Sequence, residues 1–394
     1  MRGGHLMVFI SDRLSDLVDK GEVLPRYYNP GDLFERVTIV VSNWRDSDID
    51  ASLVQPMAGS AHLEIIQHTL PFVVTSFGWR FIDRWLRRGV ERLVPLKPDL
   101  VWTLGCFQHG QLGARVSRAA GVPMITSLHG RWDVDERQSL PRWIYSKLRV
   151  RAEEESLRTA DLVIPVYADI IPYAQKRGAR RIEVVYNTIN AAALVRKQDY
   201  ALSQPARLLT INRQVPQKDP SNILRALAEG DFDCSLDVIG NGPIHARLES
   251  LVNELGLSAR VRFIPAMPNK QVCALMHSYD VLLGTCHYHG ISKGSLEAGY
   301  VGLPIVLNQR RPEPIQELKD DWMVVVEDSV AGYRSALTRL LSDEALRRRL
   351  GEAAHAKVRD VFRPQEGESR RAHLFAETAG QTADQTADAG SASE

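Results

Sequence analysis

The chain has 394 residues, of which 44% are hydrophobic and 25% are charged, and its formal net charge is +1. This length allows two domains, and this composition is typical of a soluble globular protein. The near-neutral charge gives no argument for an acidic partner, and we expect no nucleic-acid partner.

The cysteines and the apolar runs indicate the compartment. Four cysteines show neither a CxxC pair nor the spacing of a zinc site, so we expect reduced thiols. They are Cys106, Cys234, Cys273 and Cys286. No apolar run reaches the ~18–20 residues that a membrane-spanning helix needs, and the start, MRGGHLMVF, is too short and mixed for a signal peptide. We therefore expect a cytoplasmic protein, which could act at the inner face of the membrane.

Short runs rich in Val and Ile alternate with longer amphipathic segments along nearly the whole chain. In the first half the predicted strands are residues 5–11, 36–42, 62–68, 99–104, 123–129, 161–166 and 182–186. In the second half they are residues 206–212, 235–240, 260–266, 280–285, 303–308 and 322–327. Strands separated by helical patterns indicate βαβ units, so the sequence predicts an α/β fold with two doubly wound parallel sheets.

The two series of strands predict the domain organisation. We expect one domain over residues 1–190 and a second over 207–362, joined by a linker of small and polar residues at 191–206. A helix over 363–378, after Pro364, follows the second domain. The repetitive tail 379–394 is expected to be disordered.

Ligands bind doubly wound sheets outside the carboxyl ends of the strands, so residues just after strands are the candidates for chemistry. Arg213 and Lys218 follow the strand 206–212 across a turn that contains a proline, and both can neutralise one anion. A solvated basic loop is an equally good interpretation of this pair alone.

Two further polar patterns follow later strands. Gly240 and Gly242, in VIGNGP, allow close approach of a backbone to a ligand, although such turns are common. The loop of Gly290, Ser292, Lys293 and Gly294 precedes a helix, whose free N–H groups suit an anion. Glu297, about one turn into that helix, can accept two hydroxyl hydrogen bonds, as from a ribose, or can simply favour the helix N-terminus.

Together, in this order, the three patterns resemble the carboxyl-terminal domain of GT-B-fold glycosyltransferases, specifically the retaining family 4 group. The resemblance runs from about Arg207 to Phe362. NRQVPQK resembles the family's G-R-x-x-x-x-K segment, VIGNGP its G-x-G-P turn, and HGISKGSLEAGYVGLPIV its E-G-F-G…E-A…G-x-P block. The resemblance therefore implies a GT-B fold, with two Rossmann-like domains that face each other across a cleft. It also implies that the acceptor binds the first domain, that the donor binds mainly the second, and that the helix 363–378 returns to the first domain.

The resemblance also implies roles for single residues. Arg213 and Lys218 would neutralise the donor diphosphate, and Glu297 would hold the nucleotide ribose. The donor sugar and diphosphate would lie against a loop of four residues. These are Gly290, Ile291, Ser292 and Lys293. The base would lie near main-chain groups of Ala266 and Met267.

One position departs from the family pattern. The family's first glutamate, eight positions before the second, is replaced here by His289. A glutamate there contacts hydroxyls of the donor sugar, whereas a histidine cannot act as an anionic bidentate acceptor.

The first half supports the same resemblance. His129 ends a predicted strand, where transferases of this group have a histidine facing the reacting sugar, although a lone histidine there is more often structural. Asn187 lies in a segment similar to the family's P-N-G motif. Lys20 and Gly21 are expected near the donor phosphates.

Two tempting features carry less weight. Three segments, DSDID, DVDE and DFDC, contain DxD patterns. The resemblance implies no metal, because Arg, Lys and helix N-termini offset the diphosphate charge, and we expect no cofactor. The basic and aromatic run 78–97 could give weak peripheral membrane contact through Phe81 and Trp85, with arginines toward headgroups. An amphipathic helix covering a sheet explains the same pattern.

The sequence thus predicts a retaining glycosyltransferase that uses a nucleotide-sugar donor and a glycan, lipid-linked or small-molecule acceptor, in cell-surface polysaccharide or glycoconjugate biosynthesis. The catalytic candidates are His129, Arg213 and Lys218. The donor-binding candidates are Gly240, Gly242, Met267, His289, Gly290, Ile291, Ser292, Lys293 and Glu297. Two alternatives are a nucleotide-sugar 2-epimerase on the same fold and a non-catalytic nucleotide-sugar-binding protein.

Overall fold

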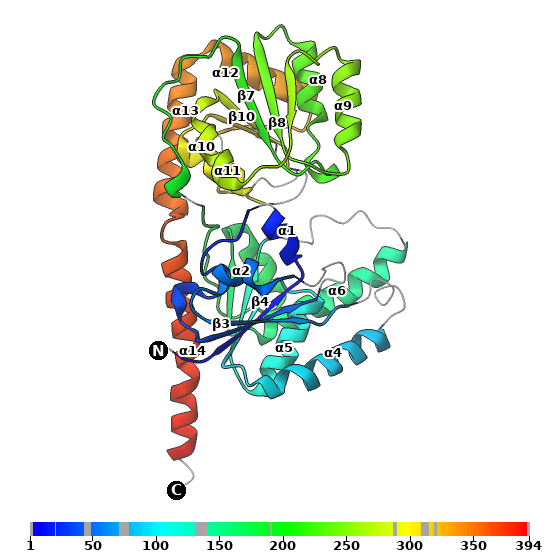
Figure 1. Ribbon diagram of the computed structural model, residues 1–394, viewed down its shortest axis with the longest axis vertical. Coiled ribbons are helices and arrows are strands. Elements are labelled where there is room, and N and C mark those ends of the chain that lie inside the picture. The colour runs from blue at the N-terminus through cyan, green and yellow to red at the C-terminus, as the bar shows by residue number, and fades with distance from the viewer. Residues whose placement is uncertain are drawn as a thin grey trace. The chain divides into compact units, whose positions relative to one another are not determined.

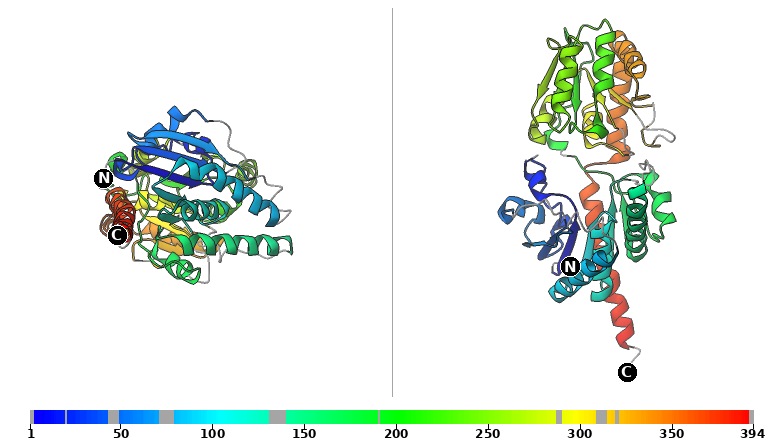
Figure 2. Two further views of the ribbon diagram at one scale, coloured as in Figure 1. Left: turned by 90° about the horizontal axis from the view of Figure 1, so that it is seen from below. Right: turned by 90° about the vertical axis from the view of Figure 1, so that its right-hand side faces the viewer.

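A computed structural model of the chain describes residues 3–19, 21–42, 49–70, 79–130, 140–189, 191–286, 290–308, 315–318 and 321–391. It divides into two compact units, of which the first comprises residues 1–185 and 366–394 and the second residues 186–365. Each unit contains one six-stranded sheet, and the turned views in Figure 2 show helices on both sides of the sheets. The predicted α/β fold with two doubly wound parallel sheets is confirmed. The strand expected at 182–186 was wrong, because that segment forms only an isolated bridge between Ile182 and Val163.

The first sheet has the strand order β3-β2-β1-β4-β5-β6, and all its strand pairs are parallel (Figure 1). Its strands are β1 (His5–Ile10), β2 (Arg36–Val41), β3 (His62–Gln67), β4 (Leu100–Leu104), β5 (Met124–Leu128) and β6 (Leu162–Pro165). From β1 the chain continues to β2 and β3 at one edge of the sheet, and from β4 it continues to β5 and β6 at the other edge. The topological switch point therefore lies between β1 and β4.

The helices of the first unit pack on both faces of this sheet. They are α1 (Leu14–Asp19), α2 (Ala51–Ala58), α4 (Trp79–Leu93), α5 (Gln108–Ala120), α6 (Leu140–Thr159), α7 (Ile171–Lys176) and α14 (Gly367–Ser391). Alternate residues of β1 enter two different cores, because successive side chains of a strand point to opposite faces. Leu6 and Val8 pack with residues of α2 and α14, whereas Met7 and Phe9 pack with residues of α4 and α5.

The second sheet repeats this plan with the order β12-β11-β10-β7-β8-β9. Its strands are β7 (Ala206–Ile211), β8 (Cys234–Ile239), β9 (Val261–Ile264), β10 (Val281–Gly284), β11 (Ile305–Asn308) and β12 (Val324–Val326). Its helices are α8 (Ser221–Glu229), α9 (His245–Glu254), α10 (Asn269–Leu275), α11 (Lys293–Val301), α12 (Val330–Ser342) and α13 (Glu344–Lys357). The switch point here lies between β7 and β10.

The segment 186–205 packs with the second unit. The ring of Tyr186 lies 4.8 Å from that of Phe362, and the buried Lys197 Nζ donates to the carbonyl of Tyr279 at 2.8 Å. Tyr200 Oη donates to the carbonyl of Gly302 at 3.0 Å. These contacts explain why the boundary between the units falls at Val185 and why the segment expected as a linker lies on the second unit.

After α13 the chain makes a π-helical turn, Val358–Phe362, and then enters α14 within the first unit. Leu374 and Phe375 of α14 are buried there, and the Phe375 ring lies edge-on to Trp102 with 5.0 Å between centroids. The expectation that residues 379–394 are disordered stays a prediction.

Candidate functional site

The residues singled out in the second half gather at the switch point of the second sheet. Arg213 and Lys218 follow β7, and Gly290 to Lys293 follow β10, so the two loops leave neighbouring strands at their carboxyl ends. Asn212 Nδ2 donates to Thr285 Oγ1 at 3.2 Å and joins the ends of these two strands. The crevice outside such a point is where doubly wound sheets bind ligands.

Gln214 connects the basic loop to the glycine turn after β8. Its side chain is fully buried, its Nε2 donates to the carbonyl of Gly240 at 2.7 Å, and its Oε1 lies 2.7 Å from His245 Nδ1. Its backbone N–H donates to the carbonyl of Asn241 at 2.9 Å. Gln214 was not predicted from the sequence, because no motif distinguishes a glutamine that holds two loops together.

Gly240 and Gly242 allow this contact between the two loops. Gly240 has a φ of +136°, and a Cβ there would lie 2.0 Å from the carbonyl oxygen of Asn212. A Cβ on Gly242 would lie 2.2 Å from the carbonyl oxygen of Gln214. Glycine is therefore needed at both positions because the backbone of the loop after β7 lies too close for a side chain.

The two cations of the basic loop differ in their surroundings. Arg213 is exposed, and it forms no ion pair with any residue that the structure describes. Lys218 is partly buried at the end of a short 3₁₀ turn, Pro216–Lys218. Asp219, the residue after Lys218, is paired with Arg247.

The loop after β10 ends in a capped helix. The side chain of Ser292 accepts a hydrogen bond from the backbone N–H of Ser295 at 3.0 Å and forms the N-cap of α11. Gly290 and Ile291, immediately before it, are buried. The N-terminus of α11 therefore lies at the switch point, where its N–H groups favour negative charge. His289 lies outside the described residues.

Glu297 is a buried carboxylate on α11, with 3% of its surface exposed. Asn269 Nδ2, at the start of α10, donates to Glu297 Oε1 at 2.9 Å. Burial and the charge of Glu297 raise the pKa of the nearby Cys273 thiol to about 12. Met267 lies two residues before Asn269, so this hydrogen bond ties the segment after β9 to α11. Asn269 was also missed, because its partner is 28 residues away.

In the first unit, His129 lies directly after β5 and is exposed. Asp12, after β1, and His109, near the start of α5, belong to the same carboxyl edge, and Asp12 acts electrostatically on both histidines. Gly21 has a φ of +62°, and Lys20 lies outside the described residues.

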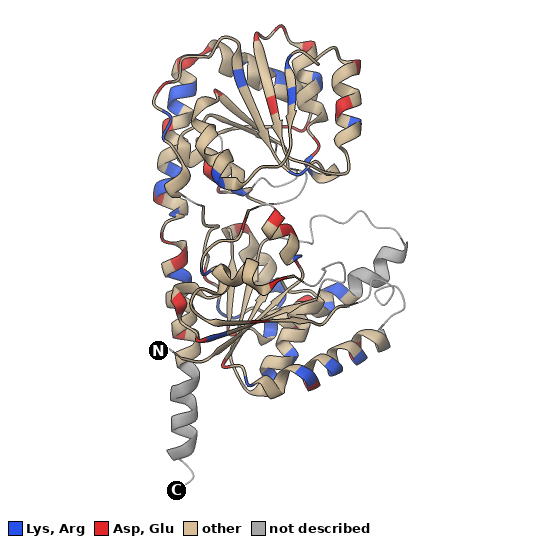
Figure 3. Cartoon of the chain, in the orientation of Figure 1, with Lys and Arg blue, Asp and Glu red and all other residues tan. Residues whose placement is uncertain are grey.

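The basic run 78–97 is the helix α4, whose apolar face covers the first sheet. Ile82, Trp85 and Leu86 are buried against β1, β2 and β3, whereas Phe81 is 53% exposed. Figure 3 shows basic positions along α4. The interpretation as an amphipathic helix that covers a sheet is confirmed for these residues, and membrane contact stays a prediction.

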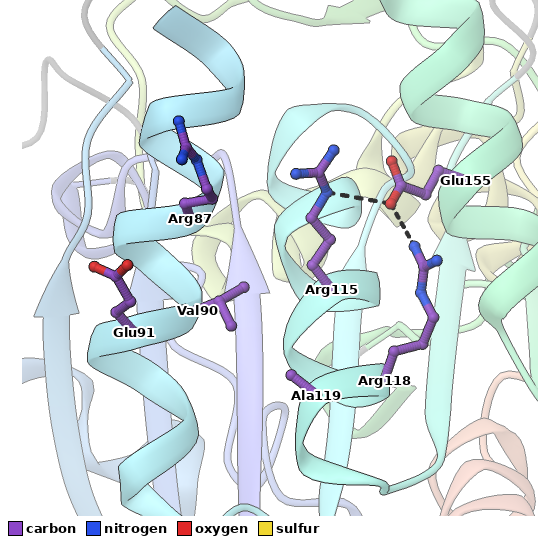
Figure 4. Close-up of a pocket in the computed structure, with 7 residues that line it drawn as sticks. All are labelled: Arg87, Val90, Glu91, Arg115, Arg118, Ala119 and Glu155. Carbon is purple, nitrogen blue, oxygen red and sulfur yellow. Dashed lines mark hydrogen bonds and ion pairs between the residues drawn. The ribbon is translucent and has the colours of Figure 1, made fainter. Parts of the chain in front are cut away.

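A hollow of about 610 Å³ lies between α4 and α5 (Figure 4). Its lining residues are Arg87, Val90, Glu91, Arg115, Arg118, Ala119 and Glu155. Arg115 and Arg118 both donate to Glu155, and Arg115 also binds Asp83 at 2.9 Å. The carboxylates offset the arginines, so this surface is mixed in charge.

Two absences concern the described part of the chain. There, no group of three or more His, Cys, Asp or Glu side chains is arranged to hold a metal ion. Among the described helices, none is long and apolar enough to cross a bilayer.

Two doubly wound sheets, the second with a basic loop, a glycine turn and a helix with a buried glutamate at its switch point, define a GT-B glycosyltransferase. Residues 35–193 match the model of the family described as Glycosyltransferase Family 4, and residues 195–357 match Glycosyl transferases group 1. The chain belongs to this family 4 group of GT-B glycosyltransferases.

Relatives and solved structures agree with this assignment. The chain is 21% identical to an uncharacterized glycosyltransferase of Methanocaldococcus jannaschii over 84% of this chain and 91% of that protein. It is 26% identical to the N-acetyl-α-D-glucosaminyl L-malate synthase of Bacillus anthracis over 61% of this chain and 64% of that protein. The fold is similar to that of Anabaena HepE in complex with UDP, with a TM-score of 0.69, 15% identity and coverage of 96% of this chain and 100% of that one.

Proposed function

We propose that this protein is a retaining glycosyltransferase that moves a hexose from a nucleoside-diphosphate sugar to a glycan, lipid-linked or small-molecule acceptor in cell-surface polysaccharide or glycoconjugate biosynthesis. The main support is the switch point of the second sheet, where Gln214 joins the Arg213 loop to the glycine turn beside the N-terminus of α11. The structures of Anabaena HepE in complex with UDP and with UDP-glucose support a uridine nucleotide as the first donor to test.

The roles we propose follow from charge and position. Arg213 and Lys218, together with the N-terminus of α11, stabilise the negative charge that develops on the departing diphosphate. Glu297, held by Asn269, accepts hydrogen bonds from the ribose hydroxyls. The backbone from Gly290 to Lys293 contacts the diphosphate and sugar, and the segment around Met267 contacts the base.

His129 orients the reacting sugar from the first unit. In the retaining mechanism we propose, the acceptor attacks on the face from which the diphosphate leaves, and a phosphate oxygen takes the acceptor proton. This route needs neither a carboxylate nucleophile nor a metal ion. We therefore expect that EDTA leaves the transfer rate unchanged.

The test begins with a thermal-shift panel of UDP, GDP and their common sugar conjugates. We expect one nucleotide series to raise the melting temperature of the wild type, and Arg213→Ala to weaken binding at least about tenfold, because a charge-assisted contact is lost. Arg334→Ala is the control, since this arginine pairs with Glu229 on the surface of the same unit. No shift with any nucleotide would contradict the proposal.

The nucleotide sugar that binds is then incubated with candidate acceptors, and the anomeric configuration of the product is read by NMR. Retention supports the proposed mechanism, and inversion would overturn it. The family match does not favour a 2-epimerase. Donor binding without hydrolysis or transfer, with turnover recovered in His289→Glu, would instead support a non-catalytic binding protein.

A further inference from the structure

His245, the first residue of α9, contacts the buried amide of Gln214. Its Nδ1 lies 2.7 Å from Gln214 Oε1, and its Nε2 lies 3.3 Å from Glu249 Oε1. Its ring packs edge-on to Phe263 of β9, with 5.2 Å between centroids. The His245 side chain is 40% exposed, whereas Gln214 is fully buried. The imidazole therefore lies between the surface of the second unit and a buried amide of the proposed donor site.

The partners of Gln214 determine which ring nitrogen of His245 carries a proton. A backbone carbonyl oxygen only accepts hydrogen bonds, so the group of Gln214 that lies 2.7 Å from the Gly240 carbonyl must be the Nε2 amino group. The group that faces His245 is then Oε1, which also only accepts. His245 Nδ1 must therefore carry a proton and donate to Gln214 in both the neutral and the charged imidazole.

This hydrogen bond belongs to a set that holds the basic loop against the glycine turn. The backbone N–H of Gln214 donates to the Asn241 carbonyl at 2.9 Å, and the backbone N–H of Ile244 donates to the Gln214 carbonyl at 3.2 Å. Asn241 Oδ1 also accepts from the backbone N–H of Ala266 at 3.2 Å, so three loops meet at Asn241. Because Gln214 directly follows Arg213, the contacts that hold Gln214 also fix the backbone from which the Arg213 side chain extends.

We propose that His245 is a positioning residue for donor binding, because its Nδ1–H holds the Gln214 amide and the held amide fixes Arg213 for the donor diphosphate. Without the Nδ1–H group, the buried Gln214 Oε1 loses this hydrogen bond, and a buried acceptor left unsatisfied costs more than the bond itself contributes. The amide then moves, and the loop of Arg213 loses its fixed position. The inference rests on the proposed function, because it names a residue that sustains the donor site of that transferase.

Three substitutions of His245 separate this hydrogen bond from packing. In His245→Asn the side-chain Nδ2 takes the place of the imidazole Nδ1 and keeps a donor toward Gln214 Oε1, whereas in His245→Gln the amide extends toward the place of Nε2. His245→Phe keeps a ring against Phe263 but has no donor. Glu249→Gln is the control, since it changes only the partner of Nε2. UDP affinity is measured by calorimetry, and circular dichroism checks that each variant is folded.

We expect His245→Phe and His245→Gln to weaken UDP binding at least about fivefold, and His245→Asn and Glu249→Gln to bind UDP within about twofold of the wild type. In an Arg213→Ala background, His245→Phe should change UDP affinity by less than about twofold, because its effect passes through that arginine. Equal UDP affinity in all three His245 variants, or an equal loss in all three, would overturn the inference. A full effect of His245→Phe in Arg213→Ala would overturn it too.

Nitrogen NMR of the His245 imidazole separates this inference from the proposed function. At alkaline pH, where the ring is neutral, we expect the proton on Nδ1 in the wild type. A proton on Nε2 would contradict the inference, whatever nucleotide the protein binds. If the proton lies on Nδ1 but the wild type binds neither UDP nor the other nucleotides of the thermal-shift panel, the proposed function is contradicted and the hydrogen bond to Gln214 is not.

Discussion

Single residues at the switch point of the second sheet hold loops together as well as lying where a ligand would bind. Gly240 and Gly242 were predicted as positions where a ligand approaches the backbone, and the structure shows that the loop of Asn212 to Gln214 already occupies the space beside them. The geometry of the site thus depends on contacts between loops as well as on the residues that would contact a ligand.

Gly240→Ala tests this dependence. The added Cβ meets the Asn212 carbonyl and the φ of +136° is unfavourable for alanine, so we expect a loss of about 3 kcal/mol in the free energy of unfolding and weaker UDP binding. Urea denaturation and calorimetry measure the two effects. Gly256→Ala is the control, because its φ of +68° is also positive but no atom lies within 4 Å of the added Cβ. Equal losses in both variants would show that the loop contact is unimportant.

Asn269 gives a prediction that depends on pH. In Asn269→Asp two carboxylates lie within hydrogen-bond range, so the pair keeps a proton to higher pH than the same groups do in the unfolded chain. A carboxyl whose pKa is raised on folding destabilises the folded state above its unfolded pKa and not below it. We therefore expect the stability deficit against wild type to grow from pH 5 to pH 8, to about 2 kcal/mol, measured by urea unfolding.

Asn269→Ala is the matched control. It removes the hydrogen bond to Glu297 without adding a second carboxylate, so its deficit of about 1 kcal/mol should grow less from pH 5 to pH 8 than that of Asn269→Asp. A deficit of Asn269→Asp that does not change with pH would show that the residue acts only through packing.

At the scale of elements, the helix α11 carries the clearest link between local structure and function. Its N-cap, Ser292, and its buried Glu297 lie one turn apart, so the residues that begin the helix also orient the proposed anion site. The helix α9 shows the opposite case. It begins only at His245, because Gln214 holds Asn241 and Ile244 through backbone hydrogen bonds.

Ser292→Ala should weaken the helix and the site together. Loss of the cap costs about 1 kcal/mol, and a frayed first turn no longer presents ordered N–H groups to an anion, so UDP binding falls. Ser329→Ala is the control. Ser329 is the N-cap of α12, and its side chain accepts a hydrogen bond from the backbone N–H of Gly332 at 3.1 Å. We expect Ser292→Ala and Ser329→Ala to lose equal stability in urea, and we expect the UDP affinity of Ser329→Ala to be unchanged. A similar fall in affinity in both variants would mean that UDP binding reports only overall stability.

At the scale of the whole molecule, the chain returns to its first unit after completing the second. The first unit is therefore complete only when α14 has docked, and residues 344 positions apart, Tyr27 and Arg371, then become neighbours. This connection gives the C-terminal helix a part in the core of the first unit.

Phe375→Ala tests the docking of α14. The ring is fully buried against Trp102, so its removal should cost the first unit about 3–5 kcal/mol. We expect one of two urea transitions to move to lower concentration while the UDP-dependent stabilisation of the second unit persists. Deleting residues 381–394 should leave both transitions unchanged. Loss of UDP binding in Phe375→Ala would show that the second unit depends on the first.

The sequence by itself determined the α/β class, the two sheets and the family. A run rich in Val and Ile indicates a buried parallel strand from adjacent residues alone. The patterns around Arg213, Gly240 and Glu297 can also be recognised from the sequence, because each is contained in one short segment. The periodicity of α4 also indicated an amphipathic helix that covers a sheet, although Phe81, expected on the same apolar face as Trp85, is exposed.

Only the tertiary structure decided which residues support the site. Gln214 binds Gly240 across 26 residues, Asn269 binds Glu297 across 28, and Arg371 reaches Tyr27 from the far end of the chain. Such contacts depend on the order of strands in the sheet and on where α14 docks, and no local pattern of residues records either. The physical reason is that a partner is chosen by proximity in space, whereas periodicity and motifs report only neighbours along the chain.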